Sequence, residues 1–115
     1  MKLAISGSRG LSVNLSEYIE ALDFEVTEII TGGAKGIDQC AEDYANQHNL
    51  KLTVIRPDYK KYPYRAAPII RNKEIVSKCD VLLAVWDGIS KGTKATINFA
   101  KKQNKPVVII TMPVG

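Results

Sequence analysis

The sequence predicts a single α/β domain of three-layer architecture, with a five-stranded parallel sheet and helices on both of its faces. Short apolar runs alternate with stretches of helical periodicity from end to end, which is the pattern of repeated strand–helix units. Three of the runs lead directly into glycine-bearing turns, which read SGSRG at 6–10, TGGAKG at 31–36 and GISKGT at 88–93. The 115 residues leave room for one core of ordinary size, so we expect residues 1–115 to form one domain.

The first half of the chain predicts three strands and two helices. Asn14 and Glu17 have the reciprocal spacing of a capping box, which opens a helix to about Leu22. Apolar residues recur at helical spacing after Ile37 and predict a second helix that ends near His48. The three strands are expected at 3–6, 26–31 and 52–55.

The second half begins with the longest irregular stretch, at 56–67, which contains two prolines and three tyrosines and is long enough to cover a pocket as a lid. Pro68 suits the first position of a third helix, which runs to about Lys78. The continuous apolar run at 81–85 lacks alternation, as expected for a central parallel strand covered on both faces. A fourth helix, which residues 96–103 continue, and a last strand at 106–110 complete the pattern.

The glycine turns also select a strand order. They follow the first, second and fourth strands, and these three strands lie side by side in the doubly wound order 3-2-1-4-5. In the alternative order 2-1-3-4-5, the third strand would separate the first from the fourth. Ligands of open α/β sheets bind at the carboxyl ends of the strands where the order reverses, so we expect a site between the first and fourth strands.

The composition excludes several classes of protein. No apolar run approaches the length of a membrane span, and the run at the N-terminus is too short for a signal peptide, so we expect a cytoplasmic protein without a membrane partner. Cys40 and Cys79 are isolated and only one histidine is present, so we expect no metal site and two buried, reduced thiols. The net charge of +4 is compatible with phosphate-bearing ligands but does not indicate them.

The first turn carries groups suited to phosphate. Gly7 and Gly10 would let the backbone approach a ligand, while Ser8 and Arg9 offer a hydroxyl and a guanidinium. The alternative is a tight strand-to-helix turn with a solvated arginine. The turn does not follow the GxGxxG pattern, which argues against an ordinary dinucleotide fold, and no lysine follows at the spacing of a P-loop.

The second turn has three glycines in five positions, more than a strand-to-helix reversal requires. Extra glycine indicates that something comes close to the backbone, which makes Gly32 and Gly33 candidates for ligand binding. Asp38 would lie in the first turn of the next helix, where the helix dipole stabilises a carboxylate without any functional role. Glu42 lies one helical turn further on, so the two carboxylates are weak candidates for a general acid/base pair.

The third turn is the richest in candidate side chains. Ser90, Lys91 and Thr93 place hydroxyls and a positive charge at a helix N-terminus, although Ser90 or Thr93 could simply cap the helix. Asp87, at the end of the strand, could accept hydrogen bonds from ribose hydroxyls. Trp86 could stack on a base, but large aromatic residues are mostly structural, and we expect it to pack in the core.

Two further features carry positive charge. Arg71 and Asn72 fall in the first turn of the third helix, where an arginine opposes the helix dipole and a bound anion would relieve the cost. In the irregular stretch at 56–67, basic residues alternate with aromatic ones, a composition that suits single-stranded nucleic acid as well as a solvated loop. These residues are Tyr59, Lys60, Lys61, Tyr62, Tyr64 and Arg65.

Four motifs in order, GSRG, ITGGAKGIDQCAEDYA, APIIRNKEIVSKC and DVLLAVWDGISKGT, resemble the SLOG superfamily, especially its small YspA/YpsA-related branch. The same order is similar to the Rossmann-like core of the DNA-processing protein A family. The resemblance covers nearly the whole chain. It implies a domain that binds nucleotides, nucleotide-derived ligands or single-stranded DNA, without a cofactor, and that forms a homodimer or larger homo-oligomer. The implied ligand shell is Gly7, Ser8, Arg9, Gly32, Gly33, Arg71, Asn72, Asp87, Gly88, Ser90, Gly92 and Thr93.

The superfamily also includes the lonely-guy phosphoribohydrolases, which cleave the N-glycosidic bond of a nucleoside monophosphate and carry a PGGxGTxxE motif. The matching stretch here is DGISKGTKAT, with Thr96 in place of the motif's glutamate. The resemblance therefore implies phosphate binding more firmly than catalysis. A hydrolase would need Asp38, Glu42 or Asp87 as a substitute carboxylate. Binding of a small nucleotide ligand is the leading hypothesis, and hydrolysis and single-stranded DNA binding are the alternatives.

Overall fold

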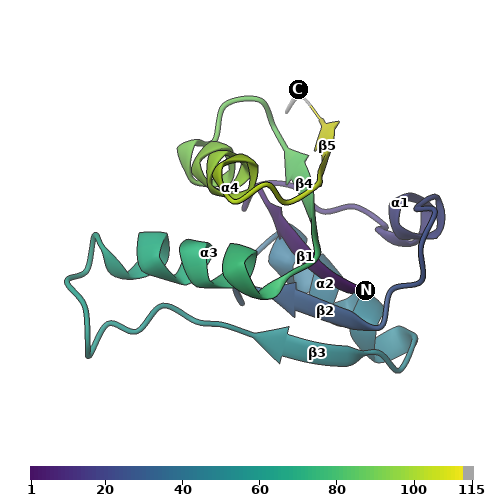
Figure 1. Cartoon of the computed structure of the whole chain (residues 1–115), viewed down its shortest axis with the longest axis horizontal. Helices are drawn as coiled ribbons and strands as arrows, with labels where there is room; N and C mark the ends of the chain where they lie inside the picture. Colours follow the sequence, from purple (N-terminus) through teal and green to yellow (C-terminus); the bar gives the residue numbers. More distant parts are fainter. Residues whose placement is uncertain (113–115) are drawn as a thin grey trace.

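The computed structural model describes residues 1–112 and confirms the α/β fold. Its five strands form one parallel sheet in the predicted order, β3-β2-β1-β4-β5 (Figure 1). The elements in chain order are β1 (Lys2–Gly7), α1 (Ser16–Glu20), β2 (Glu28–Thr31), α2 (Ile37–Gln47), β3 (Lys51–Val54), α3 (Ala67–Lys78), β4 (Val81–Trp86), α4 (Lys91–Lys102) and β5 (Val107–Thr111).

Each face of the sheet is covered by two helices, so the molecule has three layers (Figure 1). One buried cluster joins α1 and α2 to β1, β2 and β4, and the other joins α3 and α4 to the opposite face of the same strands. Residues 81–85 of β4 are all buried, as predicted for a central strand. The longest helices have 12 residues, and within residues 1–112 none combines the length and apolar character needed to cross a bilayer.

The predicted capping box at the start of α1 is wrong. The helix begins at Ser16, and buried Leu15 occupies the N-cap position with helical dihedral angles and no side-chain cap. The Asn14 side chain instead accepts a hydrogen bond from the Ser16 N–H at 3.0 Å. Burial of Leu15 in the core thus overrides the local capping pattern, and Asn14 closes a short turn outside the helix. The helix also ends at Glu20 rather than near Leu22.

Other differences lie at the ends of elements. The strand predicted at 26–31 begins at Glu28, and the last strand is shifted by one residue because Pro106 has no N–H to donate. The fourth helix begins at Lys91, in agreement with the helix N-terminus that the sequence predicts at residues 90–93. This start matters for the site, because it places Gly92 and Thr93 in the first turn of α4, where backbone N–H groups have no partner within the helix.

The two cysteines are both free, and they differ in burial. Cys79 is fully buried, as predicted, and its thiol donates to the Val76 carbonyl at 3.3 Å. Burial raises the pKa of the Cys79 thiol, because the thiolate would lose its hydration. The prediction of burial is wrong for Cys40, which is only half-buried, because it lines a surface cavity between α2 and residues 12–16.

Candidate functional site

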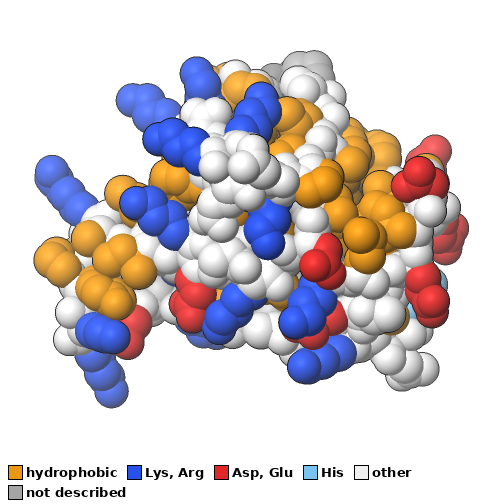
Figure 2. Space-filling view, viewed as in Figure 1, with side chains coloured by type: hydrophobic (Ala, Val, Ile, Leu, Met, Phe, Trp, Pro, Cys, Tyr) orange, Lys and Arg blue, Asp and Glu red, His pale blue; other side chains and the backbone are white. Residues whose placement is uncertain are grey.

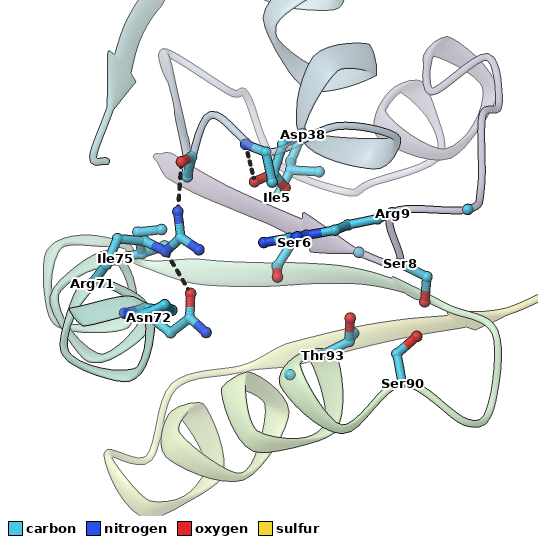
Figure 3. Close-up of a pocket in the computed structure, with 16 residues that line it drawn as sticks. Ile5, Ser6, Ser8, Arg9, Asp38, Arg71, Asn72, Ile75, Ser90 and Thr93 are labelled. Atoms are coloured by element: carbon cyan, nitrogen blue, oxygen red, sulfur yellow. Dashed lines mark hydrogen bonds between the residues drawn. The ribbon is translucent and has the colours of Figure 1, made fainter. Parts of the chain in front are cut away.

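A pocket of about 400 Å³ opens at the carboxyl ends of the central strands, and we call it the central pocket (Figure 3). It lies where the strand order reverses between β1 and β4, as the order 3-2-1-4-5 predicts. Its walls come from the end of β1 and the turn after it, the turn before α2 with the start of that helix, α3 from Pro68 to Ile75, and the N-terminus of α4. Four separate segments of the sequence therefore meet at one site.

The turn after β1 packs closely against α2 on one side and borders the central pocket on the other. A Cβ on Gly7 would lie 2.5 Å from the Ile37 Cβ, so glycine is needed for α2 to pack against the end of β1. Ser8 is buried, and its hydroxyl oxygen accepts a hydrogen bond from the Asp87 N–H at 3.1 Å. The Ser8 hydroxyl thus ties this turn to the end of β4. Arg9 is exposed, and its guanidinium extends along the central pocket (Figure 3).

The turn after β2 places a buried carboxylate in the pocket wall. Asp38 is 6% exposed, and its Oδ2 accepts a hydrogen bond from the Ala34 N–H at 3.1 Å (Figure 3). Burial raises the pKa of Asp38, while the Ala34 N–H and the positive charge of Arg71 act in the opposite direction. As predicted, Asp38 lies in the first turn of its helix. Glu42 does not line the central pocket, so the structure does not join the two carboxylates there.

Arg71 is the most unusual group of the site, because its charged side chain is 8% exposed. Its Nη1 donates to the Gly32 carbonyl at 2.6 Å, and its Nε donates to the Asn72 Oδ1 at 2.8 Å. Within residues 1–112, Nη2 makes no hydrogen bond to protein, and it points into the central pocket (Figure 3). The guanidinium is therefore fixed in place, with the N–H groups of Nη2 directed at the cavity and unused by the described residues.

The environment of Arg71 differs from the one that the sequence predicts. Arg71 is the fifth residue of α3, in the second helical turn, because the helix begins at Ala67. The interaction with the helix dipole is therefore weaker than expected. The main influence on the Arg71 guanidinium is instead the loss of hydration on burial, which lowers its pKa. Nearby Asp38 opposes this shift. The group remains charged at neutral pH, because a guanidinium ordinarily titrates far above neutrality.

The turn after β4 is closed by its own aspartate. Asp87 Oδ1 accepts hydrogen bonds from the N–H groups of Ile89 and Ser90 at 2.8 and 2.7 Å, and Oδ2 accepts one from the Ser90 hydroxyl at 2.7 Å. These bonds, led by the one from the Ser90 hydroxyl, lower the pKa of Asp87 to about 2. Ser90 occupies the N-cap position of α4, but its hydroxyl is used by Asp87, and no side chain caps the helix. Within residues 1–112, the alternative role of Ser90 or Thr93 as a helix cap is therefore not observed.

Two neighbouring side chains face away from the pocket. Thr96 is buried and donates to the Gly92 carbonyl at 3.0 Å, so it lies against its own helix. Trp86 is half-buried against the core cluster of α3 and α4, and its indole N–H donates to the Ser90 carbonyl at 3.0 Å. The sequence analysis favours packing of Trp86 against the core over stacking of its ring on a base, and the structure shows this packing.

Most of the expected ligand residues meet at the central pocket, and their ligand role stays a prediction. Gly33 faces a neighbouring cavity, and Asp87 and Gly88 lie outside the walls of both cavities. Gly10 also lines the pocket, where the sequence predicts that it lets the backbone approach a ligand, and the lining residues not predicted from the sequence are Ile5, Ser6, Ala34, Pro68 and Ile75. The expected residues that line it are Gly7, Ser8, Arg9, Gly32, Arg71, Asn72, Ser90, Gly92 and Thr93.

The neighbouring cavity has a volume of about 380 Å³, and we call it the side cavity. Its wall includes Arg56, Pro57 and Tyr59, of which Arg56 and Pro57 are absent from the predicted sites. The sequence does contain a pattern that could have predicted a role for Arg56 in the site. Arg56 follows the third strand closely, and the carboxyl ends of parallel strands share one edge of the sheet. Among residues 1–112, no group of three His, Cys, Asp or Glu side chains could hold a metal ion.

The basic and tyrosine-rich segment lies between β3 and α3, beside the side cavity. Tyr59 and Tyr64 are 51% and 80% exposed, and their rings stack with centroids 5.3 Å apart. In Figure 2 the tip of this segment, at the left, shows hydrophobic side chains flanked by Lys and Arg side chains. Lys60, Lys61 and Arg65 are all exposed there.

Comparison with known proteins agrees with this fold. The structure superimposes on the X-ray structure of DNA processing protein A from Streptococcus pneumoniae with a TM-score of 0.78 and 21% identity. The match covers 98% of this chain and 51% of that one, so the chain spans about half the length of that protein, and at this identity the likeness concerns the fold. No curated protein matches the sequence. Residues 1–62 match the profile of the YspA, cpYpsA-related SLOG family, and the chain therefore belongs to that family.

Proposed function

We propose that the protein binds a nucleotide or a nucleotide-derived small molecule in the central pocket. The observation that carries this proposal is the buried guanidinium of Arg71, whose free Nη2 faces a cavity that Arg9 also lines. Buried charges are normally paired, and within residues 1–112 Arg71 forms no ion pair. An anionic ligand would supply the missing partner. The SLOG family and the fold of DNA processing protein A support a nucleotide-related or DNA-processing role in general.

The two ends of the pocket suit different parts of a nucleotide. The uncapped N-terminus of α4, with Gly92 and Thr93, presents backbone N–H groups to a phosphate, and Arg9 adds a guanidinium. Asp38 lies on the opposite wall, in the first turn of α2, and its carboxylate is a hydrogen-bond acceptor suited to sugar hydroxyls (Figure 3). A nucleotide with its phosphate near α4 and its ribose near Asp38 would therefore contact both the N–H and guanidinium donors and the carboxylate acceptor.

The test is a binding titration with nucleoside 5′-monophosphates, followed by calorimetry and by thermal unfolding. Arg9→Ala should weaken binding about tenfold or more, the size expected for a lost hydrogen bond to a charged group. It should leave the ligand-free melting temperature unchanged, because Arg9 is exposed. Arg65→Ala is the matched control, since Arg65 is exposed and lines neither cavity. Equal affinities of the Arg9 and Arg65 variants, or absence of binding across the monophosphates, would overturn the proposal.

Single-stranded nucleic acid is a second candidate ligand, favoured by the exposed Tyr59–Tyr64 stack among three basic residues. Such binding should weaken with salt, and joint replacement of Lys60, Lys61 and Arg65 by alanine should reduce the slope of log affinity against log salt by about 2. A slope that is the same in wild type and variant would exclude this segment as the contact surface.

Hydrolysis of an N-glycosidic bond is the third hypothesis, and it depends on Asp38. Among the described residues that line the central pocket, Asp38 is the one with a carboxyl group. Burial raises the pKa of this carboxyl group, which favours the protonated form that a general acid needs. Thr96 cannot take the role of the motif's glutamate, because it is a hydroxyl turned onto its own helix. Release of free base and ribose 5-phosphate from a monophosphate, lost in Asp38→Asn, would establish this activity. The absence of a second carboxylate from the described pocket wall favours binding over hydrolysis.

A further inference from the structure

The side cavity is a continuation of the central pocket. Four residues line both cavities, namely Arg9, Gly32, Ala34 and Arg71. The two spaces therefore adjoin along the two arginines and the turn after β2. A ligand group that contacts Arg9 and Arg71 in the central pocket would lie at the entrance to the side cavity.

The turn after β2 holds two guanidinium groups in place, and both of them line the side cavity. The Gly32 carbonyl accepts a hydrogen bond from Arg71 Nη1 at 2.6 Å, and the Gly33 carbonyl accepts one from Arg56 Nη1 at 3.1 Å. A Cβ on either glycine would lie 2.6 Å from the guanidinium nitrogen that its carbonyl binds. The adjacent glycines are thus required for two arginines to lie over consecutive residues of one turn.

The charge of the side cavity is positive. Arg9, Arg56 and Arg71 line it, and none of the described residues in its wall is acidic. Asp38, by contrast, lines the central pocket alone. A ligand that extends from the central pocket into the side cavity would therefore pass through a region of three guanidinium groups, which is suited to one or more phosphates.

Beyond the arginines, the side cavity ends in an aromatic wall. Tyr59 lines the cavity, and its ring is stacked on the ring of Tyr64 with an interplanar angle of 24°. Stacking on Tyr64 restricts the Tyr59 ring before any ligand arrives, so less conformational entropy would be lost on binding. A restricted aromatic ring beside positive charge is a suitable platform for a nucleobase.

We propose that the two cavities hold one ligand, a dinucleotide whose linking phosphate or pyrophosphate lies between Arg9 and Arg71 and whose second base stacks on Tyr59. This inference rests on the proposed function of the central pocket, which would hold the first nucleotide. At about 400 and 380 Å³, the two cavities are similar in volume, and each reaches the size range of small-molecule sites.

The test compares the best-binding nucleoside 5′-monophosphate with two dinucleotides of the same base, one linked by a pyrophosphate and one by a 3′,5′-phosphodiester. At least one dinucleotide should bind the wild-type protein about tenfold more tightly than the monophosphate, as expected for one additional stacked base. The dinucleotide that gains affinity identifies the linkage. Equal affinity of the wild-type protein for all three compounds would overturn the inference and leave the proposed function intact.

Tyr59→Ala should remove the gain in affinity that the dinucleotide shows over the monophosphate. It should leave the affinity for the monophosphate unchanged. Tyr62→Ala is the matched control in the same segment, because Tyr62 lines a different surface cavity. Arg56→Gln should reduce the gain in the same way. Equal losses in the Tyr59 and Tyr62 variants would overturn the stacking role. If neither the monophosphate nor the dinucleotides bind the wild-type protein, the proposed function and this inference both fail.

Discussion

The turn after β2 and the turn after β4 are both rich in glycine, and they are stabilised in opposite ways. The turn at 31–36 is crossed by arginines from other parts of the chain, and a Cβ on Gly32 would meet Arg71 Nη1 at 2.6 Å. The turn at 87–93 is closed by hydrogen bonds to its own Asp87. A Cβ on Gly92 would have no neighbour within 4 Å among the residues that the structure describes. Glycine therefore permits close packing in the first turn and leaves open space in the second.

This difference divides the chemistry of the site between the two turns. The turn after β2 positions charged side chains through its carbonyl groups, so its geometry depends on tertiary contacts. The turn after β4 presents the backbone N–H groups of an uncapped helix, so its geometry depends on local bonds. Substitutions in the first turn should therefore affect stability more than substitutions in the second.

The largest effect is expected for Gly36→Ala. Gly36 has a φ of 75°, and its Cβ would lie 2.5 Å from the Arg9 carbonyl oxygen, which belongs to backbone. Backbone strain and overpacking together should lower the free energy of unfolding by about 2 to 4 kcal/mol. Urea denaturation would measure the change.

Gly92→Ala is the matched control in the other turn. It lies in a helix with open space around its Cβ, so the free energy of unfolding should rise by about 0.5 to 1 kcal/mol. If both variants lose the same stability, the contrast between the two turns is wrong.

A smaller effect, confined to acid, is expected for Asp87→Asn. The pKa of Asp87 falls from an ordinary value of 3.8 to about 2, so its carboxylate stabilises the fold above pH 3.8, and this stabilisation is lost as the pH falls towards 2. The difference in melting temperature between the wild-type protein and the variant should therefore narrow over that range. A difference that stays constant from pH 7 to pH 2 would contradict the role assigned to the Asp87 carboxylate.

The smallest effect, of opposite sign, is expected for Asp38→Asn. Burial raises the pKa of Asp38, so the wild-type fold loses stability as the pH rises through that value and the carboxyl ionises in place. The asparagine has no charge to bury, and its amide oxygen can still accept the Ala34 N–H. The variant should therefore melt slightly higher than the wild-type protein at neutral pH, and a lower melting temperature would indicate that attraction to Arg71 dominates.

The fold was more predictable than the site because the fold depends on repeated local signals. Each glycine turn follows a strand, and the positions of these turns along the chain were sufficient to select the strand order. The pairing of Arg71 with the Gly32 carbonyl joins residues 39 positions apart, and no local pattern contains it. Asp87 had a local signal that pointed elsewhere, since its spacing to Ser90 suits a side-chain-closed turn as well as a ligand contact.

Trp86 is suited to report on the central pocket through its intrinsic fluorescence. It is the single tryptophan of the chain, and its indole N–H is bonded to the Ser90 carbonyl at the start of α4. An anion held at the N-terminus of this helix would change the electric field and the solvation of the indole. Intrinsic fluorescence should therefore respond to occupancy of the central pocket, so that ligands can be screened by emission from the unlabelled protein.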